Sequence, residues 1–120
     1  MDSKELGFLA ENIAARYLEG RGYEIIAKNY RKPWGELDMV ARIGERIVFV
    51  EVKANRREFR GDFNPEIRVD SKKAYKIKRT AELFLEQELG SADFDWQIDI
   101  IAVTFDIQGK KAKIRHFKDV

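Results

Sequence analysis

The chain of 120 residues contains no cysteine and a single histidine. The lack of cysteine excludes a disulfide framework and any metal site built from thiolates. No apolar run approaches the roughly 18 residues of a membrane-spanning helix, and the N-terminal segment is too charged for a signal peptide. These absences predict a soluble cytoplasmic protein with no membrane partner.

The residues that are present have the composition of an ordinary globular domain. Hydrophobic residues make up 44% of the chain and charged residues 37%, which argues against wholesale disorder. A chain of this length can bury a real core but is too short to divide in two. We therefore expect one domain over residues 1–120.

The net charge of +2 hides an uneven distribution. Between Lys53 and Arg79, ten Lys and Arg residues stand against four Asp and Glu, a net charge of +6, so the rest of the chain carries −4. Such a segment differs from a uniformly neutral surface. Two interpretations stay open: a binding surface for an anionic partner, or a solvated face that happens to be basic.

Hydrophobic periodicity predicts two helices and five strands. The first helix is capped by Asp2 or Ser3, and both helices carry apolar residues at the 3.6-residue period of a helix packed on one face. The predicted elements are helices over residues 4–19 and from 70 or 71 to 89, strands over 23–30, 97–105 and 111–117, a hairpin within 35–53, and a long connection over 54–70. The order αβββαββ is typical of a small α/β domain whose mixed sheet is flanked by helices.

The predicted hairpin places charged residues within otherwise apolar strands. If Gly44 and Glu45 form its turn, antiparallel partners have residue numbers that sum to 89. Side chains alternate between faces along a strand, so one face is wholly apolar and the other carries the charges. The opposed pairs on the charged face are Asp38 with Glu51 and Glu36 with Lys53; the apolar face carries Leu37, Met39, Ala41, Val48, Val50 and Val52.

Facing carboxylates need an explanation because they repel each other. At about 5 Å and an effective dielectric near 20, the Coulomb term is roughly 3 kcal/mol. A shared proton, a cationic side chain or a divalent metal relieves it, and Lys53 neutralises only one of the three acids. The oxygen donors therefore favour a hard-cation site. The alternative is an exposed polar edge, against which Val40, Ile47 and Phe49 on the same face argue.

The same residues carry a resemblance to known proteins. Asp38, followed one strand later by Glu51-Val52-Lys53, resembles the Asp…(Asp/Glu)-x-Lys motif of restriction-endonuclease-like nucleases. With further motifs in the same order, nearly the whole chain resembles the YraN family, whose core is similar to that of Holliday-junction resolvases. The further motifs are Gly7…Glu11…Ala14…Tyr17-Leu18, Gly22-Tyr23, Asn29-Tyr30-Arg31, Gly35-Glu36-Leu37-Asp38 and Phe49-Val50.

The resemblance implies a restriction-endonuclease-like core of four or five strands with a phosphodiesterase site that uses Mg²⁺ or Mn²⁺. It implies that Asp38, Glu51 and the carbonyl of Val52 hold the metal and that Lys53 orients water or stabilises developing charge. Three more acids are expected to act around these ligands. They are Glu11, which matches a first-helix glutamate of resolvases, Glu36, which can tune Lys53 or bind a second ion, and Asp99, retained in the fourth strand.

The basic segment supplies the expected DNA contacts, since arginine and lysine bind phosphates. The residues assigned to this role are Arg56, Arg57, Arg60, Lys72 and Lys73. Lys72 and Lys73 begin the second helix, where the helix dipole disfavours cations unless an anion sits there. Two departures from the family pattern weaken the DNA assignment. Asn55 stands two residues after Lys53, where the family usually carries an arginine, and Gln97 stands where the fourth strand of relatives typically carries an arginine.

The sequence therefore predicts a metal-dependent endonuclease acting on structured or branched DNA. A nucleic-acid-binding module of the same fold without useful turnover is the alternative, and a scaffold for an acidic partner is a third. Resolvase-like relatives work as dimers, so the resemblance is compatible with a homodimer. His116, in the last predicted strand, is interpreted as incidental to the chemistry.

Overall fold

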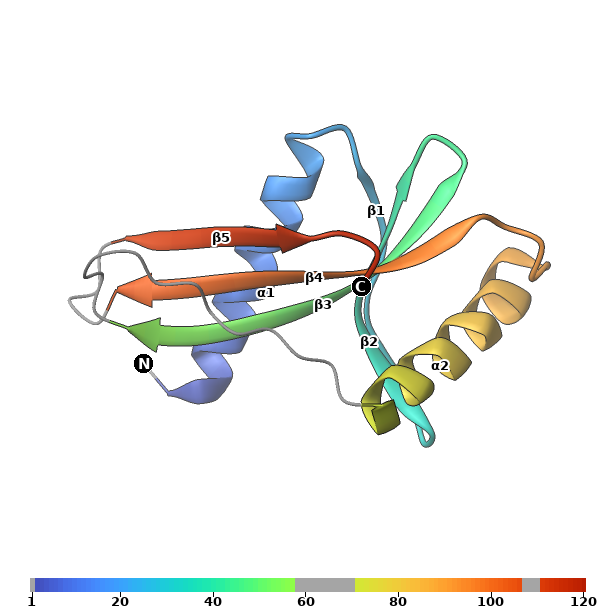
Figure 1. The fold of residues 1–120 in the computed structure, drawn as a ribbon, viewed down its shortest axis with the longest axis horizontal. Coiled ribbons are helices and arrows are strands. Elements are labelled where there is room, and N and C mark those ends of the chain that lie inside the picture. The colour runs from blue at the N-terminus through green and yellow to red at the C-terminus, as the bar shows by residue number, and fades with distance from the viewer. Residues whose placement is uncertain (1, 58–70, 107–110) are drawn as a thin grey trace.

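The computed structural model describes residues 2–57, 71–106 and 111–120 (Figure 1). The described residues form the predicted order αβββαββ, and the α/β class with a mixed sheet is confirmed. The elements are α1 (Ser3–Glu19), β1 (Glu24–Lys32), β2 (Gly35–Ile43), β3 (Arg46–Arg57), α2 (Ser71–Leu89), β4 (Trp96–Asp106) and β5 (Ala112–Phe117).

A cap and a stripe of small apolar residues set the position of α1. Asp2 accepts a hydrogen bond from the backbone N–H of Glu5 at 2.8 Å and so satisfies one of the free donors at the helix start. Ala10, Ala14 and Leu18 recur at four-residue spacing and are fully buried. The small alanines allow the helix to lie close to the sheet.

The five strands form one sheet in chain order, β1-β2-β3-β4-β5. Three of the four pairings are antiparallel, and β3 with β4 is parallel, from Ile47 opposite Trp96 to Arg57 opposite Asp106. A parallel pair needs a crossover connection, which contains α2. The long β3–β4 pair therefore forms the centre of the molecule.

The two helices cover opposite faces of the sheet. Along β3, Val48 and Val50 belong to the apolar cluster that includes α1, whereas Ile47 and Phe49 belong to the cluster that includes α2. Neighbouring residues of a strand point to opposite faces, so the helices lie on different sides. Figure 1 shows α1 against the β3–β5 part of the sheet and α2 beside β2. Charged side chains within these strands are therefore exceptional.

The third strand is longer than predicted. We expected a connection from residue 54 onward, but β3 continues to Arg57 because β4 pairs with it throughout. The backbone groups of residues 54–57 are satisfied by this pairing, which the local sequence does not indicate. The rest of the predicted connection and the predicted turn at Gln108 and Gly109 lie outside the described residues. No helix in the described ranges has the length and apolar character needed to cross a membrane.

Candidate functional site

The second and third strands separate midway along their length. Their pairing runs from Ile43 opposite Arg46 to Met39 opposite Val50, which confirms the predicted register over those residues. Beyond Met39, β2 remains paired with β1 while β3 remains paired with β4, and Figure 1 shows the two arms diverging. The acids predicted to oppose one another lie just past the last pair, in this fork.

The fork changes the face that Leu37 occupies. Regular alternation predicted that Leu37 and Met39 share a face, and this is wrong: Met39 packs in the α1 cluster and Leu37 in the α2 cluster. In the neighbouring part of β1, Asn29 has a positive φ of 52°. A residue in the left-handed region interrupts the regular pleat of β1, and it lies between the residues that pair with Met39 and Leu37.

Asp38 reaches across the fork to the backbone of β3. Its Oδ2 accepts a hydrogen bond from the N–H of Val52 at 2.8 Å, replacing the backbone partner that β2 no longer provides. Burial raises the pKa of Asp38, the Val52 hydrogen bond opposes that rise, and the charges of Glu51 and Glu36 add to it. Asp38 is therefore fixed in position and surrounded by other acids.

Glu51 is a buried carboxylate with one unsatisfied oxygen. The residue is 8% exposed, and its Oε1 forms an ion pair with Lys73 of α2. Its Oε2 is buried and accepts no hydrogen bond from the described part of the chain. A buried carboxylate oxygen without a partner is costly and rare in proteins, so this atom marks a place for a further donor or a cation.

Glu11 belongs to α1, on the face of the sheet opposite α2. Its pKa is raised first by burial and next by the charge of Asp38. Glu36 is exposed and forms an ion pair with Arg31 of β1 at 3.7 Å. The expected role of Glu36 toward Lys53 stays a prediction, and its pair with Arg31 is of the exposed kind that contributes little to stability.

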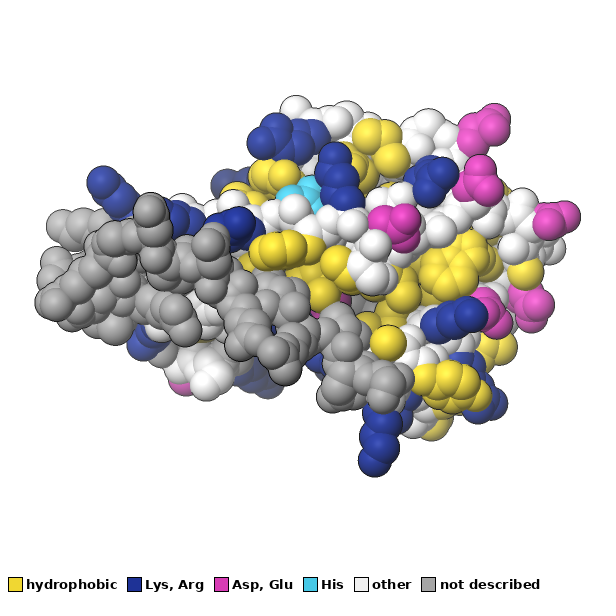
Figure 2. Space-filling view, viewed as in Figure 1, with side chains coloured by type: hydrophobic (Ala, Val, Ile, Leu, Met, Phe, Trp, Pro, Cys, Tyr) yellow, Lys and Arg dark blue, Asp and Glu magenta, His cyan; other side chains and the backbone are white. Residues whose placement is uncertain are grey.

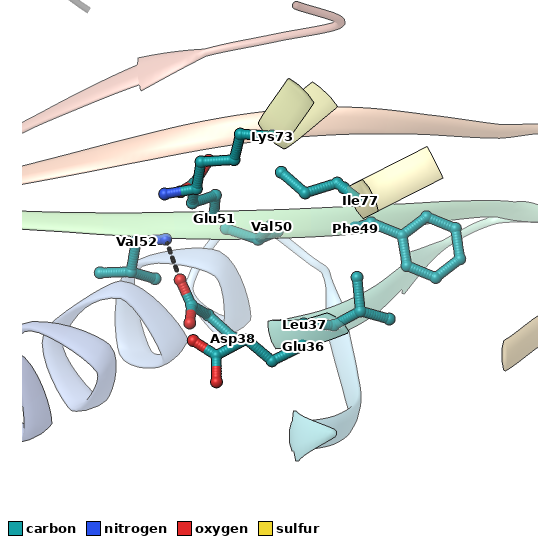
Figure 3. Close-up of a pocket in the computed structure, with 9 residues that line it drawn as sticks. All are labelled: Glu36, Leu37, Asp38, Phe49, Val50, Glu51, Val52, Lys73 and Ile77. Carbon is teal, nitrogen blue, oxygen red and sulfur yellow. Dashed lines mark hydrogen bonds and ion pairs between the residues drawn. The ribbon is translucent and has the colours of Figure 1, made fainter. Parts of the chain in front are cut away.

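Strict alternation predicted that the acids share one face of a regular hairpin. In the structure they do not. Figure 3 shows Asp38 pointing into the fork toward the Val52 nitrogen while Glu51 lies beside Lys73. Glu11 comes from α1, on the opposite face from α2. The three acids therefore come from three different elements, Asp38 from β2, Glu51 from β3 and Glu11 from α1, and Glu11 is not among the residues that line the pocket between β2 and β3.

A small pocket occupies the fork, with a volume of about 220 Å³. This lies below the roughly 300–1,000 Å³ of pockets for drug-sized ligands, so an ion with a phosphate suits it better than a larger organic molecule. Figure 3 shows the residues that line it: Glu36, Leu37, Asp38, Phe49, Val50, Glu51, Val52, Lys73 and Ile77.

The predicted catalytic lysine lies beside the pocket rather than in its lining. Lys53 is half-buried on β3, two residues after Glu51 and opposite Ala102 of β4. The lining lysine is Lys73, which sequence reasoning assigned to DNA contacts. The sequence feature that pointed to Lys73 was its position at the start of a helix, where a cation is unfavourable unless an anion lies nearby. In the structure that anion is Glu51.

The other expected DNA-contacting residues fall at the two ends of the connection between β3 and α2. Arg56 is exposed near the end of β3, and Lys72 is exposed in the first turn of α2. The backbone of Arg57 belongs to β3, while its side chain and the whole of Arg60 lie outside the described residues.

Asp99 belongs to a separate polar cluster, which does not support its expected role around the metal. It is fully buried on β4, and its carboxylate contacts His116, Gln97 and the backbone N–H of Asp119. The histidine interpreted as incidental is thus a buried partner of Asp99. No local signal could have found this pair, because 17 residues separate its members.

The donors of the pocket are of the type that hard divalent cations prefer. Asp38 and Glu51 supply carboxylate oxygens, and Glu51 Oε2 has no other partner among the described residues. Within the described ranges, no three His, Asp or Glu side chains are arranged to hold a metal ion by themselves. The residues nevertheless fit Mg²⁺, which usually keeps several waters and binds through one or two carboxylates together with substrate phosphates.

The fold and the pocket define a small α/β protein with a five-stranded mixed sheet between two helices, compatible with a nuclease-like core. Comparison with known proteins then places it. The model of the Uncharacterised protein family UPF0102, the YraN family, matches residues 10–103, and the chain belongs to this family.

Relatives in several bacteria match over most of their own length. A UPF0102 protein of Fervidobacterium nodosum is 38% identical over 93% of this chain and 78% of its own. A UPF0102 protein of Caldicellulosiruptor bescii is 34% identical over 99% of this chain and 98% of its own. A UPF0102 protein of Alkaliphilus oremlandii is 35% identical over 98% of this chain and 97% of its own. The resemblance inferred from the motifs is thereby confirmed at the level of the family.

Proposed function

We propose that the protein is a metal-dependent endonuclease that hydrolyses phosphodiester bonds in structured or branched DNA. The observation that carries the proposal is the buried Oε2 of Glu51, which has no hydrogen-bond partner among the described residues, together with Asp38, whose pKa is raised by burial and by the charge of Glu51. Such a pair is unfavourable in a protein that binds nothing there, and perturbed acids in a pocket are typical of functional sites.

In this proposal Asp38 and Glu51 hold Mg²⁺ or Mn²⁺, with the carbonyl of Val52 as the third protein ligand. The bound metal supplies a Lewis acid for the scissile phosphate and lowers the pKa of a coordinated water. The hydrogen bond from Val52 N–H to Asp38 fixes the carboxylate before any ligand arrives. Such positioning by a neighbouring donor is a common feature of metal sites.

The two lysines have different roles. Lys73 neutralises Glu51 in the absence of other cations, and its side chain is 51% exposed, so it can turn outward toward a phosphate oxygen. Lys53, on the strand that carries Glu51, orients the attacking water or stabilises charge on the phosphoryl oxygens. Arg56 and Lys72 extend the positive surface that holds the DNA backbone.

A nucleic-acid-binding module without turnover is the second candidate. The Lys73–Glu51 ion pair favours it, because the lysine already compensates one buried charge without a metal. In that case Lys73 remains on Glu51 and the pocket takes no cation.

Cleavage of labelled branched, duplex and single-stranded DNA with Mg²⁺, Mn²⁺ or EDTA tests the proposal. We expect metal-dependent cleavage by the wild type and a loss on the order of 10²-fold or more in Glu51→Gln and in Lys53→Ala, with DNA affinity within a few-fold. Glu86→Gln, a neutralised exposed acid on α2, is the matched control and should cut like the wild type.

Two results would contradict the proposal. Wild-type protein that binds these substrates and cuts none of them with either metal supports the binding module. Cleavage that persists unchanged in both variants comes from another enzyme in the preparation or from a different site.

A further inference from the structure

Two exposed aromatic side chains lie on the same part of the surface, beside the acidic pocket. Trp34 is 39% exposed in the turn between β1 and β2, and Tyr75 is 65% exposed on α2. Both line one hollow together with three basic residues of α2, Lys72, Lys76 and Arg79. We call these five residues the α2 platform.

The turn that carries Trp34 makes a close approach to α2. A Cβ atom on Gly35 would lie 2.4 Å from the hydroxyl oxygen of Thr80, so only glycine allows this approach. Thr80 is fully buried, and its hydroxyl donates a hydrogen bond to the carbonyl of Lys76 at 2.7 Å. The turn that carries Trp34 therefore lies close to α2, and the Trp34 side chain is partly accessible to solvent.

The platform is continuous with the acidic pocket. A neighbouring hollow is lined by Trp34 and Lys76 of the platform and also by Glu36 and Lys73, which line the pocket. Figure 2 shows Lys and Arg side chains gathered with exposed apolar side chains over the lower end of α2. A chain that reaches from the carboxylates across this surface meets aromatic rings and positive charges.

This combination selects one kind of occupant. Lysine and arginine attract a phosphate backbone, and an aromatic ring stacks on the face of any base. A base within a continuous duplex has both faces covered by its neighbours, so only an unpaired base offers a face to Trp34 or Tyr75. No acid is among the five residues of the platform, which fits an anionic strand.

We propose that the α2 platform stacks an unpaired base of the DNA strand that enters the pocket, so that the protein selects DNA with a single-stranded segment beside the phosphate it acts on. This inference rests on the proposed function, because it names the form of substrate for the same pocket. Neither aromatic residue was among the candidates that the sequence indicated.

Binding with the metal chelated tests the platform without cleavage. Affinities of the full chain in EDTA are measured by fluorescence anisotropy for a labelled single strand, a splayed duplex and a blunt duplex of the same sequence. Trp34→Ala combined with Tyr75→Ala should weaken binding of the first two about tenfold or more and of the blunt duplex less than about threefold. Phe8→Ala is the matched control, an aromatic residue 66% exposed on α1, and should change none of them.

Equal losses for single-stranded and duplex DNA, or no loss for either, would overturn the proposal. Equal losses of affinity would indicate a general phosphate-binding surface. No loss of affinity would indicate that the platform binds another partner, such as an acidic protein.

Tryptophan fluorescence gives a second readout that does not depend on activity. The chain has two tryptophans, so Trp96→Phe leaves Trp34 as the only reporter. A single strand should quench its emission strongly and a blunt duplex weakly, whereas Trp34→Phe should show little change with either. Quenching of Trp34 without cleavage under any metal would support base stacking on the α2 platform and contradict the proposed nuclease activity. Cleavage without any change in Trp34 emission would support the nuclease activity and contradict the stacking.

Discussion

Two buried carboxylates on neighbouring strands show what distinguishes a structural acid from a site. Asp99 on β4 is fully buried, and Glu51 on β3 is 8% exposed. In the parallel pairing of these strands, Asp99 lies opposite Val50, the residue next to Glu51. The two acids therefore have similar depth and nearly the same height in the sheet, and differ in their partners.

Asp99 has a complete set of hydrogen-bond donors. Its Oδ1 accepts from Gln97 at 2.8 Å and from the backbone of Asp119 at 2.9 Å, and its Oδ2 contacts His116 Nε2 at 2.6 Å. His116 in turn contacts the hydroxyl of Tyr17 on α1 at 3.2 Å. This network connects β4, β5, the C-terminal residues and α1, so the carboxylate has a structural role.

Glu51 has only part of such a set. Lys73 satisfies Oε1 from a half-exposed position, and Oε2 has no partner in the described ranges. A satisfied buried polar group stabilises a fold, whereas an unsatisfied one is costly unless something binds there. Completeness of partners, rather than burial, therefore separates the two acids.

The largest expected difference is in stability. Asp99→Ala leaves His116, Gln97 and the Asp119 N–H without their acceptor inside the core, so we expect a loss of about 3–5 kcal/mol in the free energy of unfolding. Glu51→Ala removes a carboxylate that is itself incompletely satisfied, and should cost less than about 1 kcal/mol. Urea denaturation in EDTA measures both. Equal losses would mean that Glu51 is a structural acid as well.

The next difference concerns divalent cations. A ligand that binds only the folded state at 100 times its dissociation constant stabilises by about 2.7 kcal/mol. Thermal unfolding with and without Mn²⁺ should show such a shift for the wild type and for Asp99→Asn, but little for Glu51→Gln. A shift of the same size in all three proteins would contradict a metal site in this pocket. The two variants are matched, because each neutralises a buried carboxylate and only Glu51 is a proposed ligand.

The smallest effect concerns Asp38 and pH. Burial raises the pKa of Asp38 in the folded chain, so the folded protein holds that proton to higher pH than the unfolded chain does. The stability this provides is complete below about pH 4, the ordinary range for an aspartate, and is lost as the pH rises through the raised pKa. The ionised carboxylate therefore destabilises the metal-free protein at neutral pH.

Asp38→Asn should consequently be more stable than the wild type in EDTA at pH 7, by about 0.5 kcal/mol, the size usual for changes outside the packed core. An asparagine oxygen can still accept the hydrogen bond from Val52. The difference should shrink as the pH approaches 4, and urea denaturation at several pH values measures it. A variant that is less stable at pH 7 and gains on acidification would reverse the sign and contradict the pKa shift.

Part of the site was predictable because the turn of the hairpin is local. Gly44 takes a positive φ of 58°, and the pairing it starts keeps the predicted register as far as Met39 and Val50. The apolar residues of β3 also lie on the faces that alternation predicted, Val48 and Val50 on one face and Ile47 and Phe49 on the other. The fork was not predictable, because it arises from β2 following β1 and β3 following β4, and the sequence of the hairpin contains neither partner.

The amino-acid sequence by itself determined the elements of this protein, their order and the presence of Asp38 and Glu51 on adjacent strands, since these follow from periodicity, caps and a two-residue turn. Only the tertiary structure decided which cation faces Glu51, which acid is satisfied by His116, and that Trp34 and Tyr75 share a surface. Those pairs join residues 17 to 41 positions apart in the chain, and the distance between such residues is set by packing, which no local pattern encodes.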